Sequence, residues 1–182
     1  LPIEPRKQWP GGGRIPLNRR NEEGRALSRW GDGGWGDRVA ENRAAGRFDD
    51  DLLEAAVELI RDRWQPDPAP TWVTVVPSVR FPGVTANFAT RLADRLGLVF
   101  VDAIVKVDDR EPQRTMQNSA MQFKNVEGAF AVADSVDPGP VILVDDIVDS
   151  RWTMTVVGAT LRDAGSGPVY PFALADTTGR ST

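Results

Sequence analysis

The chain has 182 residues, of which 41% are hydrophobic and 26% are charged, and its formal net charge is −4. This composition is typical of a soluble globular protein that is long enough to bury a core. The sequence contains neither Cys nor His, which excludes disulfides, thiol nucleophiles, His-ligated zinc and a Ser-His-Asp triad. It has no apolar run of transmembrane length and no signal peptide, so we expect a cytoplasmic protein without a membrane partner. Because the first residue is Leu, we expect a piece of a longer protein.

Residues 1–47 differ in charge from the rest of the chain. They hold ten Lys or Arg against six Asp or Glu, a net charge of +4, whereas residues 48–182 hold twelve against twenty, a net charge of −8. Their Pro and Gly content predicts a basic arm or linker ahead of a main domain over 48–182. Trp30 and Trp35 lie in a stretch that is too glycine-rich to predict a regular helix. Two interpretations stay open: these tryptophans pack the arm onto the main domain, or they stack on the bases of single-stranded nucleic acid.

The remaining sequence alternates between helix and strand patterns. An apolar stripe of helical period follows the capping acids Asp49 to Asp51 and ends at QPDPAP, which predicts a helix over 49–64. In chain order, the later predicted elements are a strand at 72–76, a helix at 84–96, a strand within 98–107, a long mobile loop at 108–124, a short strand at 129–133, a strand at 141–145, a helix at 153–164 and a strand at 168–176. This order predicts an α/β fold with a mostly parallel sheet flanked by helices.

Acidic side chains follow the most apolar of these strands, at the position where ligands collect in open α/β sheets. Asp145 and Asp146 come directly after VILV, and adjacent carboxylates at a strand's carboxyl end face partly opposite ways. The next turn is rich in short polar side chains and opens a helix, whose first N–H groups and positive dipole end suit a phosphate. Two carboxylates beside that phosphate suit the vicinal hydroxyls of a ribose.

Residues 141–155 resemble the phosphoribosyl-pyrophosphate signature of type I phosphoribosyltransferases. The matching residues are Val141 to Val144, Asp145, Asp146, Ile147, Val148, Ser150 and Thr153. The resemblance implies the Rossmann-like fold of that family, with Asp145 and Asp146 as the catalytic pair on the ribose hydroxyls and with Mg²⁺ carried by the ligand's own pyrophosphate. It also implies a flexible hood over 108–124. The ligand-binding residues that it implies are Asp145, Asp146, Asp149, Ser150, Arg151, Trp152, Thr153, Ser78 and Arg80.

A second stretch narrows the resemblance. The segment from Pro112 to Phe130 is similar to the Q…NV-x-GAF segment of ComF-type phosphoribosyltransferase domains; its matching residues are Gln113, Asn125, Val126, Gly128, Ala129 and Phe130. With EPRKQWP and GWGDR upstream, the chain resembles the C-terminal region of some actinobacterial RecQ-type DNA helicases. This implies DNA as a partner through the helicase. The phosphoribosyltransferase resemblance covers 71–178, and it does not indicate an oligomeric state or an acceptor substrate.

Three residues of the turn depart from the family pattern. Asp149 replaces a Thr and places a negative charge where a phosphate is expected, Arg151 replaces a Gly that permits positive φ, and Trp152 replaces a small residue. Arg151 could offset Asp149 or clamp the phosphate. The altered turn favours a module that binds phosphoribosyl pyrophosphate or a related nucleotide without turnover, whereas the intact acid pair favours an active transferase. A nucleic-acid or protein interaction module is a further alternative.

Overall fold

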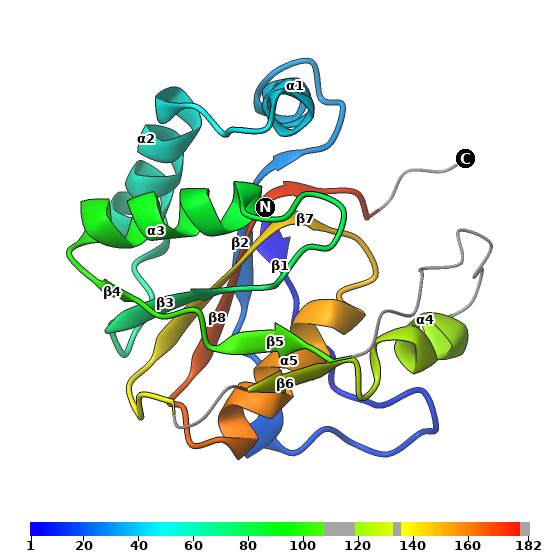
Figure 1. Ribbon diagram of the computed structural model, residues 1–182. Coiled ribbons are helices and arrows are strands. Elements are labelled where there is room, and N and C mark those ends of the chain that lie inside the picture. The colour runs from blue at the N-terminus through cyan, green and yellow to red at the C-terminus, as the bar shows by residue number, and fades with distance from the viewer. Residues whose placement is uncertain (108–118, 133–135, 179–182) are drawn as a thin grey trace.

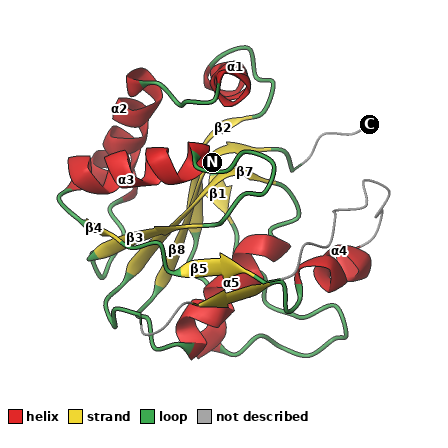
Figure 2. Cartoon of the chain, in the orientation of Figure 1, coloured by secondary structure: helices red, strands yellow, loops and turns green. Residues whose placement is uncertain are grey.

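The computed structural model describes residues 1–107, 119–132 and 136–178. A six-stranded sheet with the order β1-β2-β8-β7-β3-β4 runs through its centre (Figure 1, Figure 2). The β1–β2 pair is antiparallel, and the other pairs of this sheet are parallel. The predicted α/β class with a mostly parallel sheet is therefore confirmed. The strands are β1 (Pro2–Ile3), β2 (Gly24–Arg29), β3 (Trp72–Val75), β4 (Val99–Phe100), β7 (Val141–Val148) and β8 (Val169–Asp176).

Helices cover both faces of the sheet, which is why its central strands are apolar throughout. One face carries α1 (Trp35–Ala45), α2 (Asp50–Glu58) with its π-helical continuation η2 (Leu59–Trp64), and α3 (Val84–Leu96) (Figure 1). The other face carries α5 (Trp152–Asp163) and an antiparallel ribbon of β5 (Ile104–Lys106) and β6 (Phe130–Val132). The short helices η1 (Leu17–Arg19) and α4 (Ser119–Val126) complete the described elements. Successive residues of β7 point to opposite faces, so that Ile142 and Val144 enter the α1–α3 core while Val141 and Leu143 enter the α5 core.

The first 47 residues do not form the expected arm, because they supply two strands and a helix to the main fold. Strand β2 lies between β1 and β8 and pairs with β8 over Arg25 to Arg29. Helix α1 begins after the glycine-rich turn, where the Asp32 carboxylate accepts hydrogen bonds from the N–H groups of Gly34 and Gly36 at 2.8 and 2.9 Å. This turn was predicted to exclude a regular helix. It instead provides the tight backbone that lets α1 start directly after β2. Of the two tryptophans, Trp30 packs against the core and Trp35 is 40% exposed.

Three further elements differ from their predicted form. The strand expected within 98–107 is divided: β4 pairs with β3, and after Asp102 the chain leaves the sheet so that β5 can pair with β6. Strand β7 continues three residues beyond the predicted end, because β8 is long enough to pair with it as far as Val148. Of the predicted long loop, 119–124 belong to α4 and 108–118 lie outside the described residues.

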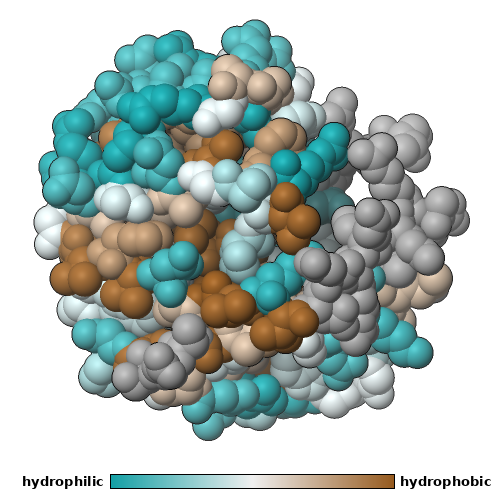
Figure 3. Space-filling model, in the orientation of Figure 1, coloured by the Kyte–Doolittle hydropathy of each residue, from teal (hydrophilic) through white to brown (hydrophobic). Residues whose placement is uncertain are grey.

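Apolar side chains gather on the face that carries β4 and β5 (Figure 3). Four valines are exposed there: Val99 at 64%, Val101 at 37%, Val105 at 47% and Val107 at 59%. Strand β4 is the last strand of the main sheet, so this apolar surface lies at the edge of the sheet.

Residues 1–47 pack so closely against α5 that adding one methyl group to the helix at Gly158 should destabilise the fold. A Cβ at Gly158 would meet the Asn21 amide oxygen at 1.7 Å, and the buried Asn21 is held because its Nδ2 donates to the Met154 carbonyl at 2.8 Å. We expect Gly158→Ala to lower the free energy of unfolding by about 1–3 kcal/mol in chemical denaturation, although Ala favours helix. The control is Gly11→Ala, because a Cβ there meets no atom within 4 Å. Equal stabilities of the two variants would contradict the packing.

Candidate functional site

A cavity of about 400 Å³ opens where β3 ends beside the longer β7. The last contact between these strands is the hydrogen bond from the Val76 N–H to the Val144 carbonyl at 2.9 Å. Beyond it β7 continues with Asp145 and Asp146, paired only with β8, so both acids lie at the open end of β3. We call this space the diacid cavity. Its lining residues are Arg43, Val76, Pro77, Ser78, Lys106, Asn125, Val126, Ala129, Phe130, Asp145, Asp146, Ile147 and Thr153.

The two carboxylates come from opposite faces of β7 and yet line the same cavity. Asp146 lies on the α1 side, where it is 5% exposed, and its Oδ2 is 2.6 Å from Nε of Arg43. Asp145 lies on the α5 side and is half-buried. Each carboxylate also accepts the N–H of the next residue at 2.8 Å, which fixes its orientation. The cavity therefore holds two fixed carboxylates, of which one is ion-paired and nearly buried.

Burial, followed by the negative charge of the neighbouring Asp146, raises the pKa of Asp145 well above that of an ordinary Asp. Arg43 opposes this shift. Two adjacent acids of which one binds a proton readily can both accept and donate hydrogen bonds to hydroxyl groups.

The turn between β7 and α5 contains a positive φ angle at a residue that is not glycine, and this conformation is sterically unfavourable. Arg151 has φ 67°, in the left-handed region where a glycine carries no steric penalty. Thr153 lies in the first turn of α5 and lines the diacid cavity; the N–H groups of such a turn have no acceptor within their own helix. The turn therefore keeps the conformation that the sequence predicted for a glycine, and it presents the start of α5 to the cavity.

The structure brings together some predicted site residues and separates others. Asp145, Asp146, Ser78 and Thr153 line the diacid cavity, whereas the exposed Arg80 does not and lies with its guanidinium over Phe81.

The remaining predicted site residues, 149–152, lie outside the lining of the cavity. The Asp149 carboxylate accepts a hydrogen bond from Thr177 Oγ1 at 3.0 Å, and the Arg151 guanidinium donates to the Glu4 carbonyl at 2.9 Å. These two residues therefore do not form the pair that the sequence suggested. Ser150 receives the Arg6 guanidinium at its carbonyl, and Trp152 is buried at 1% exposure.

Arg43 and Lys106 line the cavity but were not among the predicted site residues. Arg43 belongs to α1, within the segment that was interpreted as an arm, and its guanidinium also lies over the Phe81 ring at 4.4 Å from the centroid. No sequence signal near Arg43 connects it to residue 146, because the contact depends on how α1 packs. Lys106 belongs to β5, which was merged with β4 in the prediction.

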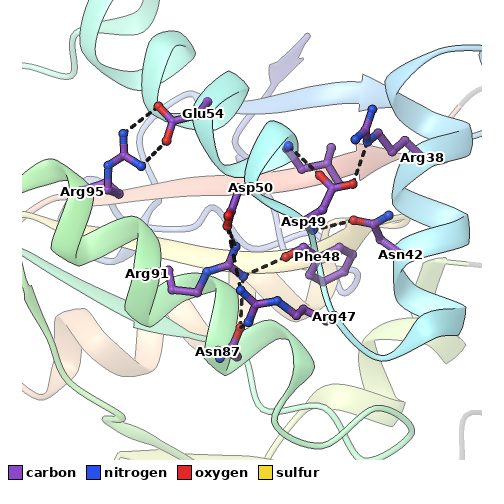
Figure 4. A network of polar contacts seen from close by, with 11 residues as sticks. Arg38, Asn42, Arg47, Phe48, Asp49, Asp50, Glu54, Asn87, Arg91 and Arg95 are labelled. Atoms are coloured by element: carbon purple, nitrogen blue, oxygen red, sulfur yellow. Dashed lines mark hydrogen bonds and ion pairs between the residues drawn. The ribbon is translucent and has the colours of Figure 1, made fainter.

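A network of ion pairs and hydrogen bonds holds α1 in place (Figure 4). Arg38 of α1 binds Asp49 and Asp51 at 2.7 and 2.6 Å, and Asn42 accepts the Asp49 N–H at 2.6 Å. Asp49 in turn caps α2 through the Leu52 N–H. Further contacts join α2 to α3 through Arg91 with Asp50 and Arg95 with Glu54. The helix that carries Arg43 is therefore joined to α2, and through α2 to α3.

The sequence matches no family model and no curated protein. Among solved structures it is similar to the orotate phosphoribosyltransferase from Aeropyrum pernix, at 20% identity and a TM-score of 0.44, covering 70% of this chain and 61% of that one. It is also similar to the adenine phosphoribosyltransferase from Leishmania tarentolae, at 15% identity and a TM-score of 0.44, covering 76% of this chain and 73% of that one. A third similar structure is the purine phosphoribosyltransferase from Pyrococcus horikoshii Ot3, at 17% identity and a TM-score of 0.42, covering 70% of this chain and 81% of that one.

The described residues contain no cluster of three or more acids that could hold a metal ion. Two adjacent carboxylates fit an ion that a ligand brings with it better than one that the protein holds alone. Among the same residues, no helix is long and apolar enough to cross a membrane.

Removal of the Arg43 cation should destabilise the fold. Arg43→Ala leaves the Asp146 carboxylate buried without its partner, and we expect the free energy of unfolding to fall by about 1–3 kcal/mol in urea. Arg63→Ala is the control, because it breaks an ion pair with Glu58 whose two side chains are 72% and 57% exposed, and it should cost less. An equal loss in the two variants would mean that the Arg43 pair has no special role.

The raised pKa of Asp145 sets the sign of a pH effect. The folded protein binds this proton more tightly than the unfolded chain, so stability decreases as pH rises from the ordinary Asp value, about 4, through the higher folded pKa. Asp145→Asn removes this loss. We expect the variant to be more stable than the parent at neutral pH, with the difference shrinking in acid. Thermal melts across pH measure it, with the exposed Asp94→Asn as control. A parent and a variant with parallel pH profiles would contradict the shift.

Proposed function

We propose that the diacid cavity binds phosphoribosyl pyrophosphate or a related ribose 5-phosphate nucleotide. The observation that carries this proposal is the position of Asp145 and Asp146 in one cavity with Thr153, at the start of α5. Two fixed carboxylates in one cavity suit a pair of vicinal hydroxyls, since each carboxylate can accept a hydrogen bond from one hydroxyl group. Because Arg43 neutralises part of their charge, an anionic ligand meets less repulsion than two free carboxylates would cause.

In this proposal the 5′-phosphate lies at the N-terminus of α5. The first-turn N–H groups and the Thr153 hydroxyl would bind its oxygens, and the helix dipole favours its charge. The altered residue Asp149 is less unfavourable than its sequence suggested, because its carboxylate is exposed and bound by Thr177. The pyrophosphate would lie toward Ser78, which lines the same cavity from the loop after β3.

Mg²⁺ belongs to the proposal as part of the ligand. The pyrophosphate of the ligand would carry the ion, which when bound would neutralise charge on the leaving group.

We propose binding without turnover as the main function. The turn has lost the family's glycine and small residue, and the side chains of Arg151 and Trp152 are used in contacts with the N-terminal segment. The second candidate is an active phosphoribosyltransferase, which the intact acid pair supports. It would pass ribose 5-phosphate to an acceptor through an oxocarbenium-like transition state, by positioning and electrostatic stabilisation. Release of pyrophosphate in the presence of an acceptor base distinguishes the two.

The ComF-like resemblance and the helicase context remain proposals that rest on sequence. Four of the residues that carry the ComF resemblance, Asn125, Val126, Ala129 and Phe130, line the diacid cavity, which supports a role for that segment in ligand binding. We propose that the chain is the C-terminal part of a RecQ-type DNA helicase, in which DNA is a partner of the longer protein.

The proposal is tested by titration calorimetry with phosphoribosyl pyrophosphate and Mg²⁺. We expect saturable binding by the parent. Asp145→Asn with Asp146→Asn should weaken it at least about tenfold, because an amide cannot replace two hydroxyl-accepting carboxylates. The matched control is Asp62→Asn with Asp94→Asn, which removes the same charge from exposed helical positions.

Circular dichroism must show that both double variants keep the fold. Equal affinity of the parent and the Asp145/Asp146 variant would overturn the assignment of the ribose hydroxyls. No binding by the parent at millimolar ligand would overturn the proposed ligand.

A further inference from the structure

A second cavity, of about 570 Å³, lies beside the same turn and shares no lining residue with the diacid cavity. The N-terminal segment forms most of it, and Ser119 of α4, Arg151 and Trp152 complete it. We call it the cationic cavity. Its lining residues are Pro5, Arg6, Lys7, Gln8, Trp9, Pro10, Ser119, Arg151 and Trp152.

Among the residues that the structure describes, three cations and no acid line this cavity. Arg6, Lys7 and Arg151 take part in none of the ion pairs formed by the described residues. The Arg6 guanidinium donates a hydrogen bond to the Ser150 carbonyl, and the Arg151 guanidinium donates one to the Glu4 carbonyl. Burial, and then the positive charge of Arg151, lower the pKa of Arg6. The fold thus brings like charges together, and none of them is ion-paired with a carboxylate of the described residues.

The two arginines are held in fixed positions. The Arg6 guanidinium lies 3.9 Å from the centroid of the Trp152 ring and donates from Nε to the Ser150 carbonyl at 2.9 Å. Trp152 is fixed in turn by its Nε1 bond to Ser119 Oγ at 2.7 Å and by Trp9, which stacks on it at 6.4 Å. Arg151 Nε is buried and has no hydrogen-bond partner among the described residues. These contacts already orient the two guanidinium groups, so a ligand would bind without ordering them.

A cationic cavity of this kind suits a compact anion of high charge. Guanidinium groups bind phosphate oxygens through several N–H donors at once, and Lys adds a flexible point charge. A single phosphate would leave part of the charge of three cations uncompensated, whereas a diphosphate carries a comparable opposite charge.

We propose that the cationic cavity is a second binding site, independent of the diacid cavity, for the diphosphate group of a small molecule. Inorganic pyrophosphate and a nucleoside diphosphate both carry this group. Arg151 directly precedes α5 and Trp152 is its first residue. A ligand here would therefore contact the two residues next to Thr153, which lines the diacid cavity.

Titration of pyrophosphate and of ADP, followed by tryptophan fluorescence and calorimetry, tests this site. The titrations use the parent and the double variant Asp145→Asn with Asp146→Asn, so that binding at the cationic cavity can be told apart from binding at the diacid cavity. We expect saturable binding of pyrophosphate to both proteins, weakened at least about tenfold by Lys7→Glu. The Lys7 side chain is exposed, so this variant should fold normally. Arg14→Glu is the control, because Arg14 is exposed in the same segment but does not line the cavity.

Arg151→Gly gives a second variant that removes a cation while keeping the positive φ of the turn, and it should also weaken binding about tenfold. Tighter binding of ADP than of pyrophosphate would assign the site to nucleotides, and equal binding would assign it to the diphosphate alone. Three results would overturn the proposal: no binding of either compound at millimolar concentration, affinities that Lys7→Glu and Arg151→Gly leave unchanged, or equally tight binding of orthophosphate. Displacement of pyrophosphate by single-stranded DNA at lower concentration would assign the cavity to nucleic acid instead.

Discussion

The ion pair between Arg43 and Asp146 joins helix α1, in the N-terminal part of the chain, to the acid pair of β7 that lines the diacid cavity. Asp146 is almost fully buried, and a carboxylate in that position is costly unless a cation lies beside it. The cation comes from α1, and α1 can supply it only because β2 occupies a place inside the sheet and the network of Figure 4 fixes α1 to α2. The diacid cavity therefore depends on the first 47 residues, which supply the cation that pairs with Asp146.

The main elements of the fold could be predicted because local pattern and tertiary structure agree there. Helix α3 was predicted with its observed bounds, 84–96. The strand VILV was predicted because it is apolar throughout, and the structure buries all four of these residues. Strand β2 could not be predicted, since GRALSR has too few apolar residues to indicate a strand. Its place depends on the long-range pairing with β8, which no local pattern encodes.

The candidate site divides in the same way. Asp145 and Asp146 were predicted from the rule that ligands collect at the carboxyl ends of parallel strands, and the structure places both in one cavity with Ser78 and Thr153. Arg43 was missed because its distance from Asp146 along the chain gives no hint of their contact. The positive φ at Arg151 shows a further limit. The sequence pattern correctly indicated which position needs that conformation, but the residue there is one that pattern reasoning would exclude. Contacts of Arg151 and Trp152 with the N-terminal segment offset the strain.

The central claim is that the diacid cavity holds a ribose phosphate between Asp145, Asp146 and the start of α5. The most direct measurement is a crystal structure of the protein with phosphoribosyl pyrophosphate and Mg²⁺. We expect the two ribose hydroxyls to lie within hydrogen-bond distance of the Asp145 and Asp146 carboxylates. We also expect the 5′-phosphate at the N–H groups of residues 152–154 and an intact ion pair between Arg43 and Asp146. A ligand bound elsewhere, or a 5′-phosphate that points away from α5, would contradict it.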